Sequence, residues 1–142
     1  MGAFDDLPTL AEVQAARAGK PIEIGPSRLQ VRMAEARDER RLNHTFRAAV
    51  WTRDRSRCRC CGRLVSRRLA RVPERGEVHH LHSRIGARRR DVRTAVLVCL
   101  ACHERVTGKV DERWAITGTA WFEEDGQPWI DATYPVECKR IA

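Results

Sequence analysis

The sequence predicts an α+β fold, with helices in the first part of the chain, a cysteine-bearing core in the middle and a C-terminal β-hairpin region. Apolar residues recur at helical spacing near the N-terminus, two Cys-x-x-Cys pairs frame the middle, and apolar and polar residues alternate near the C-terminus. With 142 residues, the chain holds one compact domain and a short appendage. We divide it into an N-terminal helix and connector (1–26), a basic helical segment (27–57), the core (58–109) and a hairpin extension (110–142).

Two capping boxes mark helix starts, since in each a hydroxyl residue and a Glu or Gln three residues later satisfy each other's backbone amides. Thr9 and Glu12 form the first box, and Gly19 is placed to end that short helix before an extended connector. Ser27 and Gln30 form the second box. The sequence therefore predicts two helices ahead of the core.

The second helix has apolar positions at helical spacing, namely Leu29, Met33 and Ala36. Either this helix or another that resumes near Asn43 continues through Phe46, Val50 and Trp51. We expect Phe46 and Trp51 to anchor the core rather than to stack on bases.

The C-terminal region, residues 114–141, alternates apolar and polar residues around a break at Gly118 and a turn at Asp125–Gly126. This pattern predicts two or three strands in hairpins. Trp114, Trp121 and Trp129 are expected to pack across the strands and cover the core.

The charge of the chain is +8, and it is concentrated in the middle. Residues 27–109 contain 22 Lys and Arg against 8 Asp and Glu, which gives this segment +14. Nearly all of these cations are Arg, whose planar guanidinium suits phosphate contacts. The pattern favours DNA, expected to be double-stranded, as the partner. The alternatives are a solvated basic face and an anionic protein partner.

The N-terminus lacks the features of a secretory signal, and no apolar run approaches the ~20 residues of a membrane span. We therefore expect a cytoplasmic protein that does not bind membranes. In a reducing compartment, paired cysteines indicate metal ligands rather than disulfides. Cys60 and Cys138 stand outside such pairs and are expected to be ordinary thiols.

Cys58-x-x-Cys61 and Cys99-x-x-Cys102 have the spacing of two zinc knuckles. Gly62 permits the tight turn after the second ligand. Four thiolates complete a tetrahedral structural Zn²⁺ site, which leaves no open coordination position for catalysis. The 37 residues between the two knuckles must form an insertion.

Histidines fall within and directly after that insertion. His79 and His80 are neighbours on an expected strand, so their side chains point to opposite faces. His103 follows the second cysteine pair directly, where a helix is expected to begin. His82 shares the face of His80, and a solvent-exposed position is favoured for it.

The order of Cys-x-x-Cys, a His-His strand and Cys-x-x-Cys-His followed by Val-Thr-Gly resembles the HNH endonucleases, the ββα-metal group of nucleases with a treble-clef-like core. The resemblance covers about 46–109, more than a third of the chain. It implies that His79 and His103 bind a catalytic divalent metal (Mg²⁺, Mn²⁺, Ni²⁺ or Zn²⁺) and that His80 is the general base. The implied reaction hydrolyses DNA to 5′-phosphate and 3′-hydroxyl ends.

The resemblance also bears on two threonines, and position along the chain suggests roles for four arginines. Thr94 stands where the family has an Asn that braces the loop carrying the base, and Thr107 stands where some members have another metal-binding His. Arg84, four residues beyond His80, is expected to hold the scissile strand or a neighbouring phosphate. The cluster Arg88, Arg89 and Arg90 is expected to track the DNA backbone.

Two alternatives to an active nuclease stay open. The first is a zinc-containing DNA-binding module with weak or no turnover, because Thr94 lacks the amide of Asn. The second is a structural zinc protein that docks an acidic protein partner. Small stand-alone members of the family are often encoded by phages or mobile elements, and the resemblance favours that origin.

Overall fold

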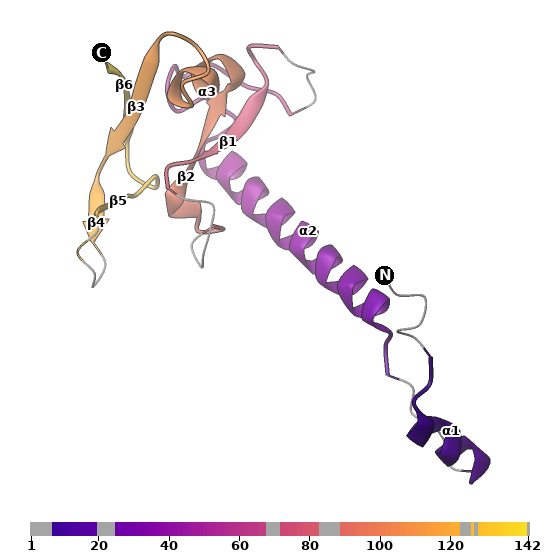
Figure 1. Ribbon diagram of the computed structural model, residues 1–142. Coiled ribbons are helices and arrows are strands. Elements are labelled where there is room, and N and C mark those ends of the chain that lie inside the picture. Colours follow the sequence, from indigo (N-terminus) through magenta and orange to yellow (C-terminus); the bar gives the residue numbers. More distant parts are fainter. Residues whose placement is uncertain are drawn as a thin grey trace. The chain divides into compact units, whose positions relative to one another are not determined.

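The computed structural model describes residues 7–19, 25–67, 72–82, 89–122, 126 and 128–141. Helices and small sheets coexist in it, which confirms the α+β prediction (Figure 1). The chain forms two compact units, Met1–Arg41 and Leu42–Ala142. Within the described residues, no helix combines the length and the apolar character needed to cross a membrane.

Both predicted capping boxes are present. The Thr9 hydroxyl accepts the amide N–H of Glu12, and the Glu12 carboxylate accepts the amide N–H of Thr9 at the start of helix α1 (Leu10–Arg17). Gly19 follows this helix with a φ of 69°, a left-handed value that favours glycine. Ser27 and Gln30 form the same reciprocal pair at the start of α2 (Arg28–Arg53).

Helix α2 is continuous, so the alternative of a separate helix resuming near Asn43 is wrong. Leu29 and Met33, in its first half, are exposed. Phe46, Val50 and Trp51, in its last turns, are buried in the core of Leu42–Ala142, as predicted. Sequence spacing therefore identified the helix, while burial is confined to its C-terminal end.

The core of Leu42–Ala142 contains a β-β-α unit. Strand β1 (Gly76–His80) pairs antiparallel with β2 (Ala95–Cys99), and helix α3 (Leu100–Val106) follows β2 directly. The five residues of β2 are all buried, which accounts for its unbroken apolar sequence. A 3₁₀ turn, η1 (Val92–Thr94), leads into β2.

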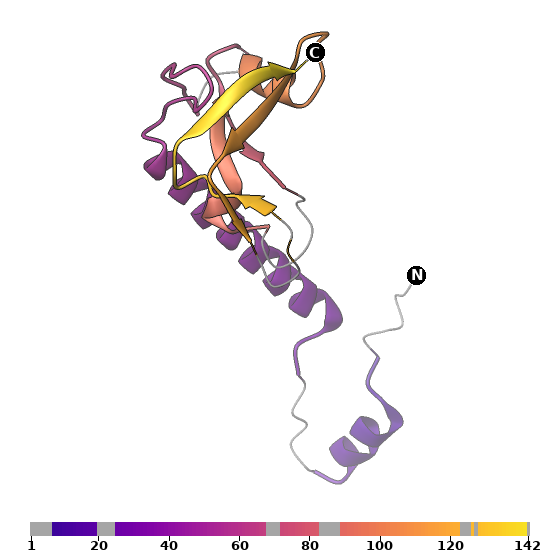
Figure 2. The same ribbon diagram turned by 90° about the vertical axis from the view of Figure 1, so that its left-hand side faces the viewer.

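The C-terminal region is a broken antiparallel ribbon. Strand β3 (Arg113–Gly118) pairs with β6 (Val136–Ile141), and β4 (Ala120–Phe122) pairs with β5 (Pro128–Ile130). Figure 2 shows the long strands β3 and β6 side by side. The described residues thus hold four strands where the sequence predicted two or three. The break falls at Gly118, as expected, but Asp125 of the predicted turn lies outside the described residues.

The tryptophans of this ribbon divide between two environments. Trp121 and Trp129 are opposite one another on β4 and β5 with ring centroids 5.8 Å apart, which confirms the predicted cross-strand packing. Trp114 instead lies under the guanidinium of Arg105 on α3, which is 5.4 Å from its ring centroid.

A buried carboxylate, which sequence reasoning missed, joins these parts. Asp54 accepts hydrogen bonds from Arg53, from Arg59 and from the amide N–H of Leu97 on β2. The two guanidinium groups also donate to four backbone carbonyls, those of Val92, Ala95, Ala132 and Tyr134. The Arg53–Asp54–Arg59 network therefore fixes the end of α2 against β2 and against the chain between β5 and β6.

Gly76, at the start of β1, has no room for a side chain. A Cβ there would lie 2.4 and 2.6 Å from two ring atoms of Trp51 and 3.0 Å from Val65 Cγ2. Because Trp51 is buried, we expect Gly76→Ala to lower the free energy of unfolding by about 1–3 kcal/mol through overpacking.

Urea unfolding followed by tryptophan fluorescence measures the effect of Gly76→Ala. Gly25→Ala is the control, since a Cβ at Gly25 would meet nothing within 4 Å. Its free energy of unfolding should change by no more than about 0.5 kcal/mol. Equal stability of the two variants would contradict the proposed close packing at Trp51.

Candidate functional site

The four cysteines predicted to bind zinc form one cluster. The sulfur atoms of Cys58, Cys61, Cys99 and Cys102 all lie within 4.8 Å of one another. Cys61 Sγ and Cys99 Sγ are 3.8 Å apart. Zinc–sulfur bonds of about 2.3 Å place neighbouring sulfurs of a tetrahedral site roughly 3.8 Å apart. The donor set and its spacing therefore fit a metal ion such as zinc.

Local backbone geometry places each cysteine pair. In the first pair, the Gly62 amide N–H donates to the Cys58 carbonyl and the Cys58 amide N–H donates to the Arg63 carbonyl, both at 2.8 Å. Gly62 has a φ of 73°, so the expected requirement for glycine after Cys61 is confirmed. In the second pair, Cys99 is the N-cap of α3, whose first turn brings Cys102 to the same centre.

Burial governs the electrostatics of the four-cysteine cluster. It raises the pKa of the Cys58 thiol, and burial together with repulsion from Cys58 strongly raises the pKa of Cys102. Burial also opposes ionisation of Cys61, but hydrogen bonds from the backbone at Arg63 and from neighbouring thiols outweigh it and lower the Cys61 pKa. A divalent cation deprotonates coordinating thiols and removes their mutual repulsion.

Cys60 and Cys138 form a disulfide, so the prediction that both are ordinary thiols is wrong. Their Cα atoms are 5.1 Å apart although 78 positions separate them in sequence. The bond links the turn of the first cysteine pair to β6. No local spacing rule relates two residues so distant in sequence, and they meet because the C-terminal ribbon folds back on this turn.

His79 and His103 come together from two different elements of the β-β-α unit. Their ring centroids are 5.4 Å apart in an edge-to-face arrangement, with His79 on β1 and His103 on α3. Two imidazoles bound to one ion at metal–nitrogen distances of about 2.1 Å have centroids roughly 5 Å apart. The structure thus brings together the two histidines that the resemblance implies as ligands of a catalytic metal. The Thr107 hydroxyl donates to the His103 carbonyl and so caps the end of α3.

His80 contacts a different set of residues from His79, as opposite strand faces require. Its ring stacks on Phe46 of α2, with centroids 5.4 Å apart. Its Nε2 atom is 3.1 Å from the carbonyl oxygen of Arg89. Because a carbonyl only accepts, Nε2 carries the proton in this contact, and Nδ1 is the basic nitrogen of the neutral ring.

A pocket of about 250 Å³ opens beside His80. Its cationic walls are Arg47 of α2 and the exposed Arg89, and Asn43 lies at its rim. Arg90 donates to Asn43 Oδ1 at 3.0 Å, which ties the predicted arginine cluster to α2. Arg84 and Arg88 lie outside the described residues. Sequence reasoning missed Asn43 and Arg47, although their spacing with Phe46 places all three on one helical face.

Thr94, which the resemblance compares with an Asn of the HNH nucleases, is buried. Its hydroxyl donates to the Asp91 carbonyl at 2.8 Å. Its own carbonyl accepts the amide N–H of Leu81, also at 2.8 Å, directly after His80. A threonine thus fixes the chain on both sides of the 82–93 segment without an amide side chain.

His82 is half-buried, so the favoured solvent-exposed position is wrong. Its Nε2 accepts the amide N–H of Ile130 at 3.0 Å, and its ring packs on Trp129 with centroids 4.5 Å apart. Burial lowers the pKa of His82, which favours the neutral ring that this hydrogen bond needs. His82 therefore holds β5 against the end of β1.

The structure brings the predicted site residues into two groups near the β-β-α unit: four cysteines in one cluster and His79 against His103. His80 lies in a separate pocket that it lines together with Phe46 and Arg47 of α2. No protein-family model, curated protein or solved structure matches the chain. The function is therefore inferred from the geometry of these groups.

Proposed function

We propose that this protein is a metal-dependent endonuclease of the HNH type that hydrolyses phosphodiester bonds of double-stranded DNA. The observation that carries the proposal is the contact of His79 with His103 beside the four-cysteine cluster. A structural metal at that cluster would fix the start of α3, and hence His103, relative to β1. The basic pocket at His80 adds a place for the phosphate.

His79 and His103 would hold the catalytic divalent cation, for which Mg²⁺, Mn²⁺, Ni²⁺ and Zn²⁺ are all candidates. When bound, such an ion neutralises charge on the phosphoryl group and on the leaving oxygen. Two imidazoles are a sparse ligand set, so water and phosphate oxygens would complete the coordination.

His80 is the proposed general base. Its imidazole accepts a proton from water as the water oxygen forms a bond to phosphorus, and the bond from phosphorus to O3′ breaks. Because Nδ1 is buried in this structure, this step requires DNA binding to open a path for water to the ring. O3′ leaves with a proton from solvent, so the products carry 5′-phosphate and 3′-hydroxyl ends. The hydrogen bond from Nε2 to the Arg89 carbonyl fixes the tautomer and supports the imidazolium that forms.

Arginines around the pocket are proposed to hold the DNA backbone. Arg47 and Arg89 line it, and Arg90 is anchored beside it through Asn43. Arg84 and Arg88 are proposed for the same role from the family resemblance alone. These groups contact phosphates, which carry no sequence information, so we propose cleavage with little sequence preference.

Nicking of supercoiled plasmid in Mg²⁺, Mn²⁺, Ni²⁺ or Zn²⁺ tests the proposal. We expect the wild-type protein to nick the plasmid with at least one of these ions. We expect His80→Ala to lower the rate by about 10²–10⁴-fold, the usual contribution of a general base. His103→Ala should abolish the response to the divalent ion.

Thr107→Ala is the matched control, because it alters the same helix as His103 at its C-cap. It should keep most of the activity. Wild-type cleavage no faster than that of His80→Ala with every ion would refute the nuclease. Salt-dependent DNA binding without cleavage would then favour the DNA-binding module, and loss of both would favour the structural zinc protein.

A further inference from the structure

We propose that a cationic groove along α2, formed by His44, Arg47, Arg67 and Arg75, binds successive backbone phosphates of one DNA strand. We call it the α2 groove. The inference rests on the proposed function for its ligand and for the position of the scissile phosphate at His80. It assigns DNA contacts to side chains other than the arginine cluster at 88–90.

The α2 groove consists of pockets that share walls. A pocket of about 260 Å³ is lined by His44, Arg47, Arg67 and Arg75 together with Trp51. Arg47 also lines the pocket of His80. Trp51 and Arg67 also line a third pocket, of about 330 Å³. Shared lining residues therefore link the pocket of His80 to the two pockets at Trp51.

The arginines of the α2 groove differ in their partners. Arg75 forms an ion pair with Glu77, its Nε lying 2.8 Å from Oε1. Among the described residues, no carboxylate forms an ion pair with Arg47 or Arg67. Both of these side chains are exposed. Their charge is thus available to an anionic ligand, and clustered cations of this kind match a phosphate backbone.

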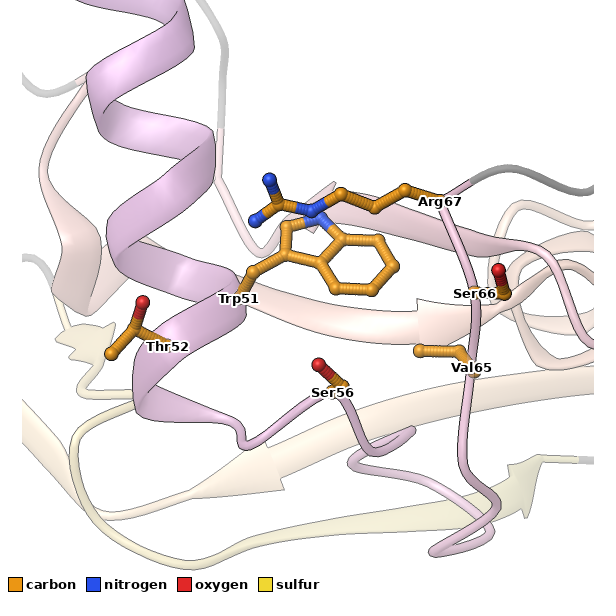
Figure 3. Close-up of a pocket in the computed structure, with 6 residues that line it drawn as sticks. All are labelled: Trp51, Thr52, Ser56, Val65, Ser66 and Arg67. Carbon is orange, nitrogen blue, oxygen red and sulfur yellow. The ribbon is translucent and has the colours of Figure 1, made fainter.

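Arg67 is held in place by an aromatic ring. Its guanidinium lies over Trp51, 4.6 Å from the ring centroid, and Figure 3 shows the side chain extended across the indole. Stacking fixes the plane of the guanidinium and leaves its N–H groups directed outward for a phosphate oxygen. Hydroxyl donors line the same pocket, those of Thr52, Ser56 and Ser66.

The same contact argues against recognition of bases in the α2 groove. Trp51 is buried to 6% exposure, and Arg67 covers its ring. The ring therefore offers no open face on which a base could stack. Residues 43–52 of α2 span roughly 14 Å, the length of about four base pairs along the axis of a DNA duplex. The groove should therefore bind the backbone of any sequence.

The test measures affinity for a short duplex by fluorescence anisotropy over a series of salt concentrations. The zinc-loaded full chain is used without added Mg²⁺, Mn²⁺ or Ni²⁺, so the readout does not depend on cleavage. The slope of log K against log salt is negative, and each lost phosphate contact reduces its magnitude by about 0.9. The double variant Arg47→Gln/Arg67→Gln should therefore reduce the magnitude of the slope by about 1.8 and weaken binding.

Lys139→Gln/Arg140→Gln is the charge-matched control for the double variant and Arg140→Gln is the control for each single one, because Lys139 and Arg140 lie on β6 and pair with Glu137 and Glu112. Both controls should leave the slope unchanged. Arg67→Lys keeps the charge and should restore the slope lost in Arg67→Gln, with weaker binding because the flat stack is lost. Circular dichroism checks that each variant is folded.

Two outcomes would overturn the α2 groove: a slope in the double variant equal to that of Lys139→Gln/Arg140→Gln, or no binding of the duplex by the wild-type protein. Binding only of an acidic peptide, such as oligoaspartate, would likewise refute it. If the double variant keeps the wild-type salt slope while the wild-type protein cleaves DNA and His80→Ala does not, the groove is refuted and the nuclease is supported. If the double variant has the reduced salt slope but the wild-type protein cleaves no DNA, the groove is supported and the nuclease is refuted.

Discussion

Removal of metal from the four-cysteine cluster is expected to unfold the Leu42–Ala142 unit. The cluster joins the turn after α2 to the start of α3, and three of its four cysteines are themselves buried core residues. Structural zinc contributes an apparent binding free energy of about 10–16 kcal/mol in small zinc domains at neutral pH. That is of the same size as the ~5–15 kcal/mol stability of an ordinary domain, so loss of the metal can remove most or all of it.

Far-UV circular dichroism with and without a zinc chelator measures this loss. Cys102→Ser should reproduce it in metal-replete buffer, because a hydroxyl does not replace a thiolate on zinc. Cys138→Ser is the control cysteine, since it removes the disulfide partner of Cys60 and leaves the four ligands intact. It should melt at a lower temperature but keep one metal per chain. A chelated protein with an unchanged spectrum would contradict a structural metal.

Local patterns explain which parts of this site could be predicted. The spacing of Cys58 and Cys61 places both sulfurs on one side of a turn that ends at Gly62. The four-cysteine cluster could therefore be predicted from the positions of its cysteines and of this glycine. Cys102 and His103 are neighbours in the sequence and also lie close together in the structure, because both belong to one turn of α3. The capping boxes of α1 and α2 were predictable for the same reason: their hydrogen bonds span three residues.

Contacts between distant segments explain what could not be predicted. His82 accepts a hydrogen bond from Ile130 of the C-terminal ribbon, 48 positions away in the sequence. The sequence around neither residue indicates that contact. The disulfide of Cys60 and Cys138 has the same origin. Asp54 was missed for a different reason, since an aspartate between arginines resembles a solvated surface pair until its burial is known.

Replacement of Asp54 is expected to cost about 3–5 kcal/mol of unfolding free energy, the usual effect of removing one partner from a buried ion pair. Asp54→Ala leaves the guanidinium groups of Arg53 and Arg59 partly buried without their carboxylate, and it removes the acceptor of the Leu97 amide. Asp54→Asn keeps an oxygen for that amide and should be intermediate. Urea unfolding at pH 7 measures both variants.

Asp38→Ala is the matched control, because Asp38 lies on the same helix in an exposed pair with Arg41. Exposed pairs of this kind contribute about 0–1 kcal/mol, so its effect should be small. Equal losses for Asp38→Ala and Asp54→Ala would refute the Arg53–Asp54–Arg59 network as an anchor of the core.

The stability that Asp54 contributes should also depend on pH. Burial alone would raise the pKa of its carboxyl, but hydrogen bonds from Arg53, the Leu97 amide and Arg59 outweigh burial and hold the pKa below its usual value. The ionised, paired form then contributes its full stability above the unfolded-state pKa of about 3.9. That contribution is lost as pH falls through the lower pKa of the folded state.

The difference in unfolding free energy between wild type and Asp54→Asn should therefore be constant from neutral pH down to about pH 5 and should narrow below pH 4. Because acid also releases metal from thiolates, and metal loss is expected to unfold this unit, the metal content of both proteins is measured at each pH, and the comparison uses the pH values at which both keep one metal per chain. A difference that stays constant to pH 3 would mean that the Asp54 carboxyl is not held ionised by its two arginines. A difference that widens on acidification would reverse the assigned direction of its pKa.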